Sequence, residues 1–402
     1  MSVDFYARGR ELGAWAYIPD KPLEGRPGGP LENLSFSVKD LFEVKGWPLT
    51  ASSRAPLPPV EPSELVKTLL ERGASCLGKT HLHEIAFGIL GWNPITGQAK
   101  NPLDPSRISG GSSSGAAISV ALGECDFALG TDTGGSIRTP AALCGVAGYK
   151  PTHGHYSSVG VLHLSPTCDH AGTLARDVQT LIRVDEALFE RPIPKSSLVG
   201  LKIGFWNVPH WTTPEVWAAF SRITQALGAL PFDFPGEHRP EVMETYSSIV
   251  QYEAAKVHRA TLEGENPGFG APTLELLRRG QGIPQNHYHQ AMRERESLKA
   301  TLEAFFTRFD VILAPTVPAV APRIGQEVLE LSGGSTALRP AFLRLTTPFS
   351  LLGVPVVSLP LKIGTLSAGV QLVGRSGDDS RVLSLALELE SLIFKTFKES
   401  PS

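Results

Sequence analysis

The chain carries RISGGSSSGAAISVALGECDFALGTDTGGSIR at residues 107–138, a stretch in which two serines, Ser112 and Ser136, each follow a pair of glycines. Glycine pairs allow backbone conformations closed to other residues, and their N–H groups can gather around one ligand atom, as in an oxyanion hole. The Ala-rich run after Ser112 predicts a closely packed helix, and CDFALG predicts a buried strand. Ser136 is therefore predicted to lie on a tight turn after a strand.

Two other interpretations of this stretch fail on its context. Residues 111–115 satisfy the G-x-S-x-G template with Ser113 at the centre. That nucleophile elbow must follow an apolar strand, whereas the preceding NPLDPSRIS contains two prolines and an aspartate. No lysine follows the glycines at the spacing of a phosphate-binding loop. We therefore reject Ser113 as an elbow nucleophile and reject a phosphate site.

Further motif-like segments lie on both sides of the two serines. It comprises NPLDPSRISGGSSSGAA at 101–117, GTDTGGSIRTPAALCGVAGYKPTHG at 130–154 and SSVGVLHLSPTCDHAGTLARDV at 157–178. Together these segments resemble the signature of the amidase signature enzymes, which include indole-3-acetamide hydrolases and the catalytic subunit of glutamyl-tRNA amidotransferase. The resemblance implies one amidase domain over residues 1–402, with an α/β amidase signature fold whose mixed central β-sheet is covered by helices on both faces.

The resemblance is unevenly distributed along the chain. It covers roughly residues 30–185 and 305–395, which we expect to form the core. Residues 191–305 contain the strand-like LVGLKIGFW, the amphipathic PEVWAAFSRITQALG and long helical stretches. We expect this variable, mainly helical region to shape the substrate pocket.

Lys39 stands near the end of the strand-like LSFSVKDLF, among apolar neighbours. Most such lysines are salt-bridged or reach solvent, but burial lowers the pKa of an ammonium and can leave an amine able to accept a proton. The family's catalytic lysine precedes an aspartate at a strand end, as Lys39 precedes Asp40. The resemblance implies that Ser136 is the nucleophile, that Ser112 bridges it to Lys39, and that Lys39 is the base that later protonates the leaving amine.

The resemblance also implies the surroundings of the nucleophile. Relatives have a non-proline cis peptide at the position of Gly111 and Ser112. Asp132 and Arg138 are expected to brace the nucleophile loop by hydrogen bonds without taking part in bond breaking. The oxyanion hole is expected to consist of backbone N–H groups, those of Thr133, Gly134, Gly135 and Ser136.

Histidines offer two competing chemistries. His81 and His83 would share one face of a strand, as ligands of a metal-dependent amidohydrolase could, but no further ligands recur at later strand ends, so we predict no metal. Family members usually carry Asn and Asp there, and the departure leaves the role of this segment open. A Ser-His-Asp triad could draw on the four downstream histidines, but the family uses no catalytic histidine. These four are His153, His155, His163 and His170.

Net charge, hydropathy and the cysteine pattern exclude several classes of function. A formal net charge of -3 gives no basic footprint for nucleic acid, and no run is long and apolar enough for a membrane helix, so we expect a soluble, cytoplasmic enzyme that binds neither. The four cysteines lack C-x-x-C spacing and are expected to be small buried hydrophobes. We expect a small linear amide as substrate and no cofactor, and a homodimer is left open.

Three alternatives remain to be distinguished from a free-standing amidase. A glutaminase like that of the amidotransferase would need partner subunits, and a metal-dependent amidohydrolase would need a metal. A non-catalytic binding module of the same fold would have lost site residues, and the retention of Lys39, Ser112 and Ser136 argues against it. Family members commonly carry Asn where this chain has Ser350, which puts one supporting hydrogen bond in doubt.

Overall fold

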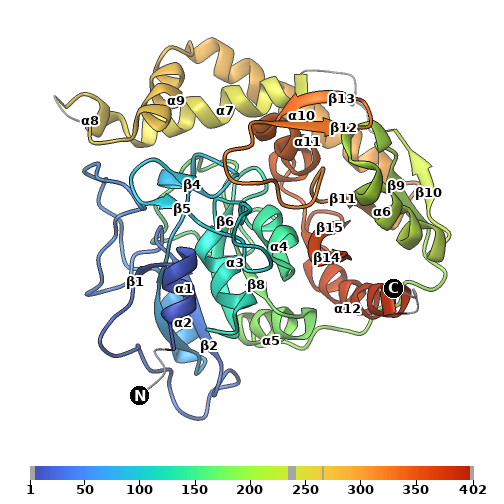
Figure 1. The fold of residues 1–402 in the computed structure, drawn as a ribbon, viewed down its shortest axis with the longest axis horizontal. Coiled ribbons are helices and arrows are strands. Elements are labelled where there is room, and N and C mark those ends of the chain that lie inside the picture. Colours follow the sequence, from blue (N-terminus) through green and yellow to red (C-terminus); the bar gives the residue numbers. More distant parts are fainter. Residues whose placement is uncertain (1–4, 234–240, 265–266, 399–402) are drawn as a thin grey trace.

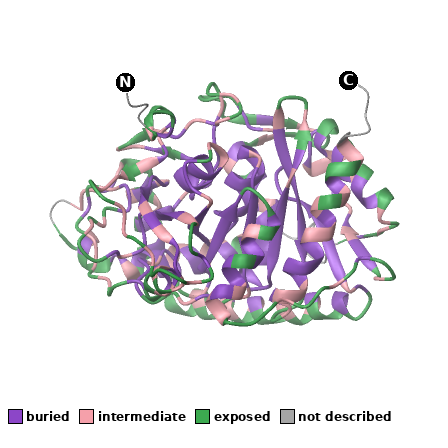
Figure 2. Cartoon of the chain, turned by 90° about the horizontal axis from the view of Figure 1, so that it is seen from below, coloured by how far each residue is buried: buried purple, intermediate pink, exposed green. Residues whose placement is uncertain are grey.

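A computed structural model describes residues 5–233, 241–264 and 267–398. Its main feature is an 11-stranded sheet that crosses the whole molecule (Figure 1). Figure 2 shows the strands buried along most of their length, with the exposed residues on the outer helices and loops. The α/β architecture predicted from the sequence, a mixed sheet flanked by helices, is confirmed.

The sheet mixes parallel and antiparallel pairs. β2 pairs in parallel with β3 and β6, and β9 with β10 and β11, while the neighbours in the middle of the sheet are antiparallel. In spatial order the strands are β1 (Trp15–Tyr17), β3 (Ser75–Thr80), β2 (Ser35–Lys39), β6 (Phe127–Asp132), β8 (His170–Ala175), β7 (Ala147–Lys150), β14 (Val356–Ile363), β15 (Leu366–Val373), β11 (Val311–Pro315), β9 (Ile203–Trp206) and β10 (Leu230–Phe232).

The other strands form two small antiparallel hairpins, β4 (Trp92–Asn93) with β5 (Gly97–Gln98) and β12 (Val328–Leu331) with β13 (Gly334–Ala337). The helices are α1 (Ala7–Leu12), α2 (Glu64–Glu71), α3 (Ser114–Ala121), α4 (Arg138–Cys144), α5 (Val178–Phe189), α6 (Pro214–Ala226), α7 (Glu241–Val257), α8 (Arg259–Leu262), α9 (Ala271–Gln281), α10 (Gln285–Phe306), α11 (Leu338–Leu351) and α12 (Asp379–Lys398), with 3-10 turns η1 (Glu84–Ala86) and η2 (Pro209–Trp211).

The stretch at 107–138 folds as its composition predicts. The Ala-rich run forms α3, which is buried from Ser114 through Val120 and packs against β6 and β2. Gly115 in its first turn has no room for a side chain, because a Cβ there would overlap the carbonyl oxygen of Ala14. Such close packing explains the small residues of α3. β6 is buried at every position, and it ends at Asp132, where the loop that carries Ser136 begins.

The region at 191–305 is helical only in its second part. The strand and helix expected in its first part are β9 and α6, and β9 and β10 extend the central sheet beyond β11. The second part contains α7, α9 and α10, which pack together along one side of the molecule (Figure 1). α11 packs against both α7 and α4, so this helical layer reaches the segment that follows Ser136.

The structure also bears on the expectations about the cysteines and about membrane-spanning helices. All four cysteines are buried and free, as expected of small apolar side chains. Among the helices of residues 5–398, outside the two internal gaps, none combines the length and the apolar character that crossing a bilayer requires.

Candidate active site

Lys39 is the last residue of β2, and its side chain is fully buried. Its amine lies among hydroxyl groups, with Nζ 2.7 Å from Ser112 Oγ, 2.9 Å from Ser113 Oγ and 2.8 Å from Thr131 Oγ1. Because the Ser113 hydroxyl donates to the Thr131 carbonyl oxygen (3.2 Å), it can only accept from the amine. The hydroxyl of Ser112 has no such competing acceptor among the described residues and can donate to a neutral amine.

The charge state of Lys39 follows from what surrounds it. Burial lowers the pKa of Lys39 to about 7, although the carboxylates of Asp132 and Asp169 partly oppose the shift. Its neighbour Asp40 does not pair with it, because Asp40 Oδ1 forms a buried ion pair with Lys79 Nζ at 2.6 Å. Lys39 therefore has no carboxylate in contact, and a large fraction of the amine is neutral near pH 7.

The loop after β6 is held by the carboxylate of Asp132. Its oxygens accept the backbone N–H groups of Gly135 (2.8 Å) and Ile137 (3.1 Å) and the side chain of Arg138 (Nη2 2.9 Å, Nε 3.0 Å). Burial by itself raises the pKa of Asp132, but the Arg138 guanidinium outweighs it and holds that pKa below its usual range. Asp132 is thus a carboxylate anion whose hydrogen bonds fix the conformation of the loop at 132–138.

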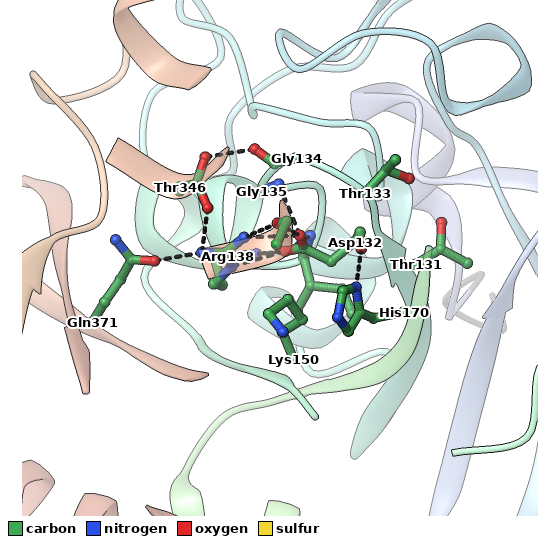
Figure 3. Close-up of polar contacts among 12 residues, drawn as sticks. Thr131, Asp132, Thr133, Gly134, Gly135, Arg138, Lys150, His170, Thr346 and Gln371 are labelled. Carbon is green, nitrogen blue, oxygen red and sulfur yellow. Dashed lines mark hydrogen bonds and ion pairs between the residues drawn. The ribbon is translucent and has the colours of Figure 1, made fainter. Parts of the chain in front are cut away.

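Arg138 ties this loop to distant segments, as Figure 3 shows. Its Nη1 donates to the carbonyl oxygen of Thr346 (3.1 Å) and to Gln371 Oε1 (2.6 Å), while Nη2 donates to Ser350 Oγ (2.5 Å). The Ser350 hydroxyl in turn donates to Asp132 Oδ1 (2.9 Å). The supporting hydrogen bonds that the replacement of Asn by Ser350 put in doubt are present, because the Ser350 hydroxyl contacts both Arg138 and Asp132.

We expect Arg138→Met to lower the free energy of unfolding by roughly 3–5 kcal/mol, because it leaves the buried Asp132 carboxylate without its cation. Urea unfolding at neutral pH measures the change. The double variant Asp132→Asn with Arg138→Met should recover part of the loss, since neither member of this buried pair is then charged. A loss below about 1 kcal/mol, typical of a surface ion pair, contradicts the bracing role.

Ser112 and Ser136 occupy adjoining loops. The peptide between Gly111 and Ser112 is cis, as the resemblance implied, and the Ser113 N–H donates to the Ser136 carbonyl oxygen at 3.1 Å. Ser136 keeps 5% of its surface exposed, and its hydroxyl forms no hydrogen bond with any described residue. A hydroxyl that is reachable and uncommitted is what a nucleophile requires.

The turn before Ser136 needs glycine for two reasons. Gly135 has φ +126°, a conformation that favours glycine, and a Cβ on Gly134 would overlap the hydroxyl of Tyr246 on α7. The N–H of Gly135 is taken by Asp132. Within the described chain, the N–H groups of Thr133, Gly134 and Ser136 have no acceptor.

The four downstream histidines do not contact either serine among the described residues. His170 Nδ1 lies 3.0 Å from the carbonyl oxygen of Asp132, and burial, with Lys150 nearby, holds its pKa well below the usual value. His163 binds Asp169 (3.0 Å), and Asp169 also accepts from the Thr133 hydroxyl (2.6 Å). The other two, His153 and His155, contact Pro166 and Asp185. His170 and, through Asp169, His163 therefore support the loop at 132–138, whereas His155 lies against α5.

His81 and His83 follow β3 and lie in a loop, not on one face of a strand. His81 Nε2 is 2.6 Å from Thr96 Oγ1, whereas the His83 ring packs against Gly88 and Trp92. Burial lowers their pKa values to about 4 and about 3. The described residues contain no group of three His, Cys, Asp or Glu side chains placed to bind a metal. The backbone N–H of His83 donates to the Ser112 carbonyl oxygen (3.2 Å) and so supports that serine.

Sequence reasoning missed two partners of the Lys39 amine, Ser113 and Thr131. Thr131 is the second-last residue of β6, which runs beside β2, so its position at the end of a neighbouring strand was a usable signal. Ser113 was considered only as an elbow nucleophile. Its contact with Lys39 arises from the turn at residues 111–113 and has no separate sequence signal.

Comparison with known proteins gives consistent matches. A family model described as Amidase matches residues 11–383. The indoleacetamide hydrolase of Allorhizobium ampelinum is 32% identical, over 92% of this chain and 86% of its own. A glutamyl-tRNA(Gln) amidotransferase subunit from Methanospirillum hungatei JF-1 is 31% identical, over 93% and 96%. A crystal structure described as an amidase is 38% identical, with a TM-score of 0.91 over 97% of this chain and 94% of that one.

Proposed function

Because the chain belongs to the amidase family, we propose that it hydrolyses a small carboxylic amide to the acid and ammonia, with Ser136 as nucleophile, Ser112 as relay and Lys39 as base. The observation that carries this proposal is the buried Lys39 amine, 2.7 Å from the Ser112 hydroxyl and without a carboxylate in contact. Such an amine can take up a proton near neutral pH and later return it.

In the first half-reaction, Ser136 Oγ attacks the amide carbon while its proton passes to Ser112 and the Ser112 proton passes to Lys39 Nζ. The unoccupied N–H groups of Thr133, Gly134 and Ser136 stabilise the oxyanion, and Asp132 keeps the loop in the required shape. The proton then returns through Ser112 to the leaving nitrogen, the C–N bond breaks, and ammonia departs.

In the second half-reaction, water attacks the acyl group on Ser136, and the same relay takes its proton. The proton returns to Ser136 Oγ as the ester bond breaks, so the acid is released and the enzyme is regenerated. Lys39 acts as base and then as acid in each half, which suits a group whose pKa burial lowers to about 7.

A panel of simple amides tests this function directly. We expect ammonia release from at least one short aliphatic or aryl-acetic amide by the isolated chain, without partner subunits. Dialysis against a strong chelator should leave the rate unchanged, because two neutral buried histidines without a third ligand do not make a metal site. Loss of activity that added zinc restores supports the metal-dependent alternative instead.

The relative from Methanospirillum hungatei favours a second candidate, a glutaminase that works in an amidotransferase. The two functions give different results in the same assay. A glutaminase of this kind should release ammonia from glutamine only when its partner subunits are present, whereas a free-standing amidase should act alone on amides without an α-amino group.

A further inference from the structure

Arg339, in the first turn of α11, is a partly buried cation that lacks an anionic partner. Its guanidinium lies over the ring of Phe87, 6.0 Å from the centroid, and its Nε is buried with no acceptor. In the described part of the chain, no side chain or carbonyl forms a hydrogen bond or an ion pair with it. An unpaired charge that is removed from water is costly, so a group outside the chain is the natural partner.

The helix places Arg339 close to the reaction centre. Arg339, Leu343 and Thr346 follow one another at the i, i+4, i+7 spacing that lines one face of a helix. Leu343 Cδ2 would lie 3.1 Å from a Cβ on Gly134, and the Thr346 hydroxyl donates to the Gly134 carbonyl oxygen at 2.5 Å. Arg339 therefore lies about 6 Å along the helix axis from Leu343, which packs against Gly134.

The charge of Arg339 reaches the other side of the site as well. Burial is the main cause that lowers the pKa of His83 to about 3, and the nearby charges of Arg339 and Lys39 add to it. The backbone N–H of His83 donates to the Ser112 carbonyl oxygen. Tyr246, whose hydroxyl lies against Gly134, is also within the electrostatic range of Arg339. The guanidinium is thus within electrostatic range of two residues that contact the serine loops, His83 at Ser112 and Tyr246 at Gly134.

We propose that Arg339 binds a carboxylate at the far end of the acyl group, so that the preferred substrates are monoamides of short dicarboxylic acids. This proposal rests on the amidase function and names the substrate class for the same site. A guanidinium can hold a carboxylate by two parallel hydrogen bonds, which fixes orientation as well as charge. The methylenes between the two ends would lie against Phe87 and Leu343, which are apolar and mostly buried.

The test compares two amides of equal chain length, glutaramate with its terminal carboxylate and pentanamide without it. We expect the wild-type chain to prefer glutaramate in kcat/KM. Arg339→Met should lower kcat/KM for glutaramate roughly 10- to 100-fold and leave that for pentanamide nearly unchanged, because only one substrate loses hydrogen bonds to a charged group. Arg339→Lys should recover only part, since an ammonium cannot form the paired contact.

Arg344 provides the matched control, because it is on the same helix but lies over Trp211, 5.6 Å from the ring centroid. Arg344→Met should keep the preference for glutaramate. The charge reversal Arg339→Glu should favour 5-aminopentanamide over glutaramate. Equal losses on glutaramate and pentanamide in Arg339→Met, or a wild-type preference for pentanamide, overturn the proposal.

A binding measurement separates this proposal from the amidase function itself. Glutarate should raise the thermal unfolding midpoint of the wild-type chain and of Arg344→Met, but not that of Arg339→Met. That readout needs no turnover. If no amide is hydrolysed while glutarate stabilises the protein through Arg339, the proposed function fails and the carboxylate site stands. If amides are hydrolysed and glutarate has no Arg339-dependent effect, the carboxylate site fails alone.

Discussion

Ser136→Ala is expected to abolish amide hydrolysis, with kcat lower by about 10⁴- to 10⁶-fold, the range in which loss of a nucleophile places serine hydrolases. The same variant should no longer react with a fluorophosphonate probe, which labels activated serine hydroxyls. The physical reason is that Ser136 combines a hydroxyl that is partly exposed with neighbouring N–H groups that lack an acceptor among the described residues. Turnover by ammonia release and labelling by intact-protein mass are the two measurements.

Ser114→Ala is the matched control for the nucleophile. Ser114 belongs to the same serine run, but its hydroxyl faces His81 (3.4 Å from Nδ1) and makes no contact with Lys39. Labelling and turnover should survive in this variant. Ser113 is unsuitable as a control, because its hydroxyl lies 2.9 Å from the Lys39 amine. Undiminished labelling of Ser136→Ala assigns the nucleophile to another serine.

Lys39→Met should lower kcat/KM for amides by several orders of magnitude, since it removes both the acceptor of the serine proton and the acid for the leaving nitrogen. The loss should be smaller on esters, whose leaving group needs less help from an acid. Lys39→Arg should not restore activity, because a guanidinium stays protonated. Lys67→Met on the exposed side of α2, where Lys67 lies near Glu71, should be neutral.

The pH dependence gives the sharpest test of the base. The neutral amine is the active form, and burial lowers the pKa of Lys39 to about 7, so kcat/KM should fall as the pH drops through that value and should level off above it. The ordinary lysine pKa near 10.4 would place this fall in alkaline solution. A wild-type profile that rises only toward pH 10, or a Lys39→Arg variant with wild-type activity, would falsify the assignment.

Local elements were readable from the sequence because their signals are local. Residues 62–72, PSELVKTLLER, have an amphipathic pattern that predicts a helix, and they contain α2, with Ser63 as its N-cap and Leu65 and Leu69 buried. The Ala-rich run is α3, and CDFALG supplies β6. The strand order was not readable, since pairs such as β7 with β14 join segments whose sequences carry no mark of their partner. β10, with only three residues, has too short a pattern to detect.

The candidate site likewise has parts that could be predicted from the sequence and parts that could not. Lys39, Ser112 and Ser136 could be named because their motifs are short and continuous in sequence. The hydrogen bonds of Ser350, and the lack of a described partner for the Arg339 guanidinium, could not be predicted, because each depends on where α11 lies against the loop at 132–138. Nor could the use of the Gly135 N–H by Asp132, which follows from the path of the backbone within the turn. Motifs in the sequence predict the reacting groups, and packing decides what surrounds them.

The hydrogen bonds of Arg138 also bear on how the protein matures during synthesis. Its acceptors in Thr346 and Gln371 lie 208 and 233 residues further along the chain. While the ribosome is still producing the middle of the protein, β2, β6 and both serines already exist, and the guanidinium can pair only with its neighbour Asp132. Chains fold progressively as they emerge, so the contact between Arg138 and Gln371 can form only after β15 has left the exit tunnel. The loop that carries Ser136 therefore gains its full set of supporting contacts only near the end of translation.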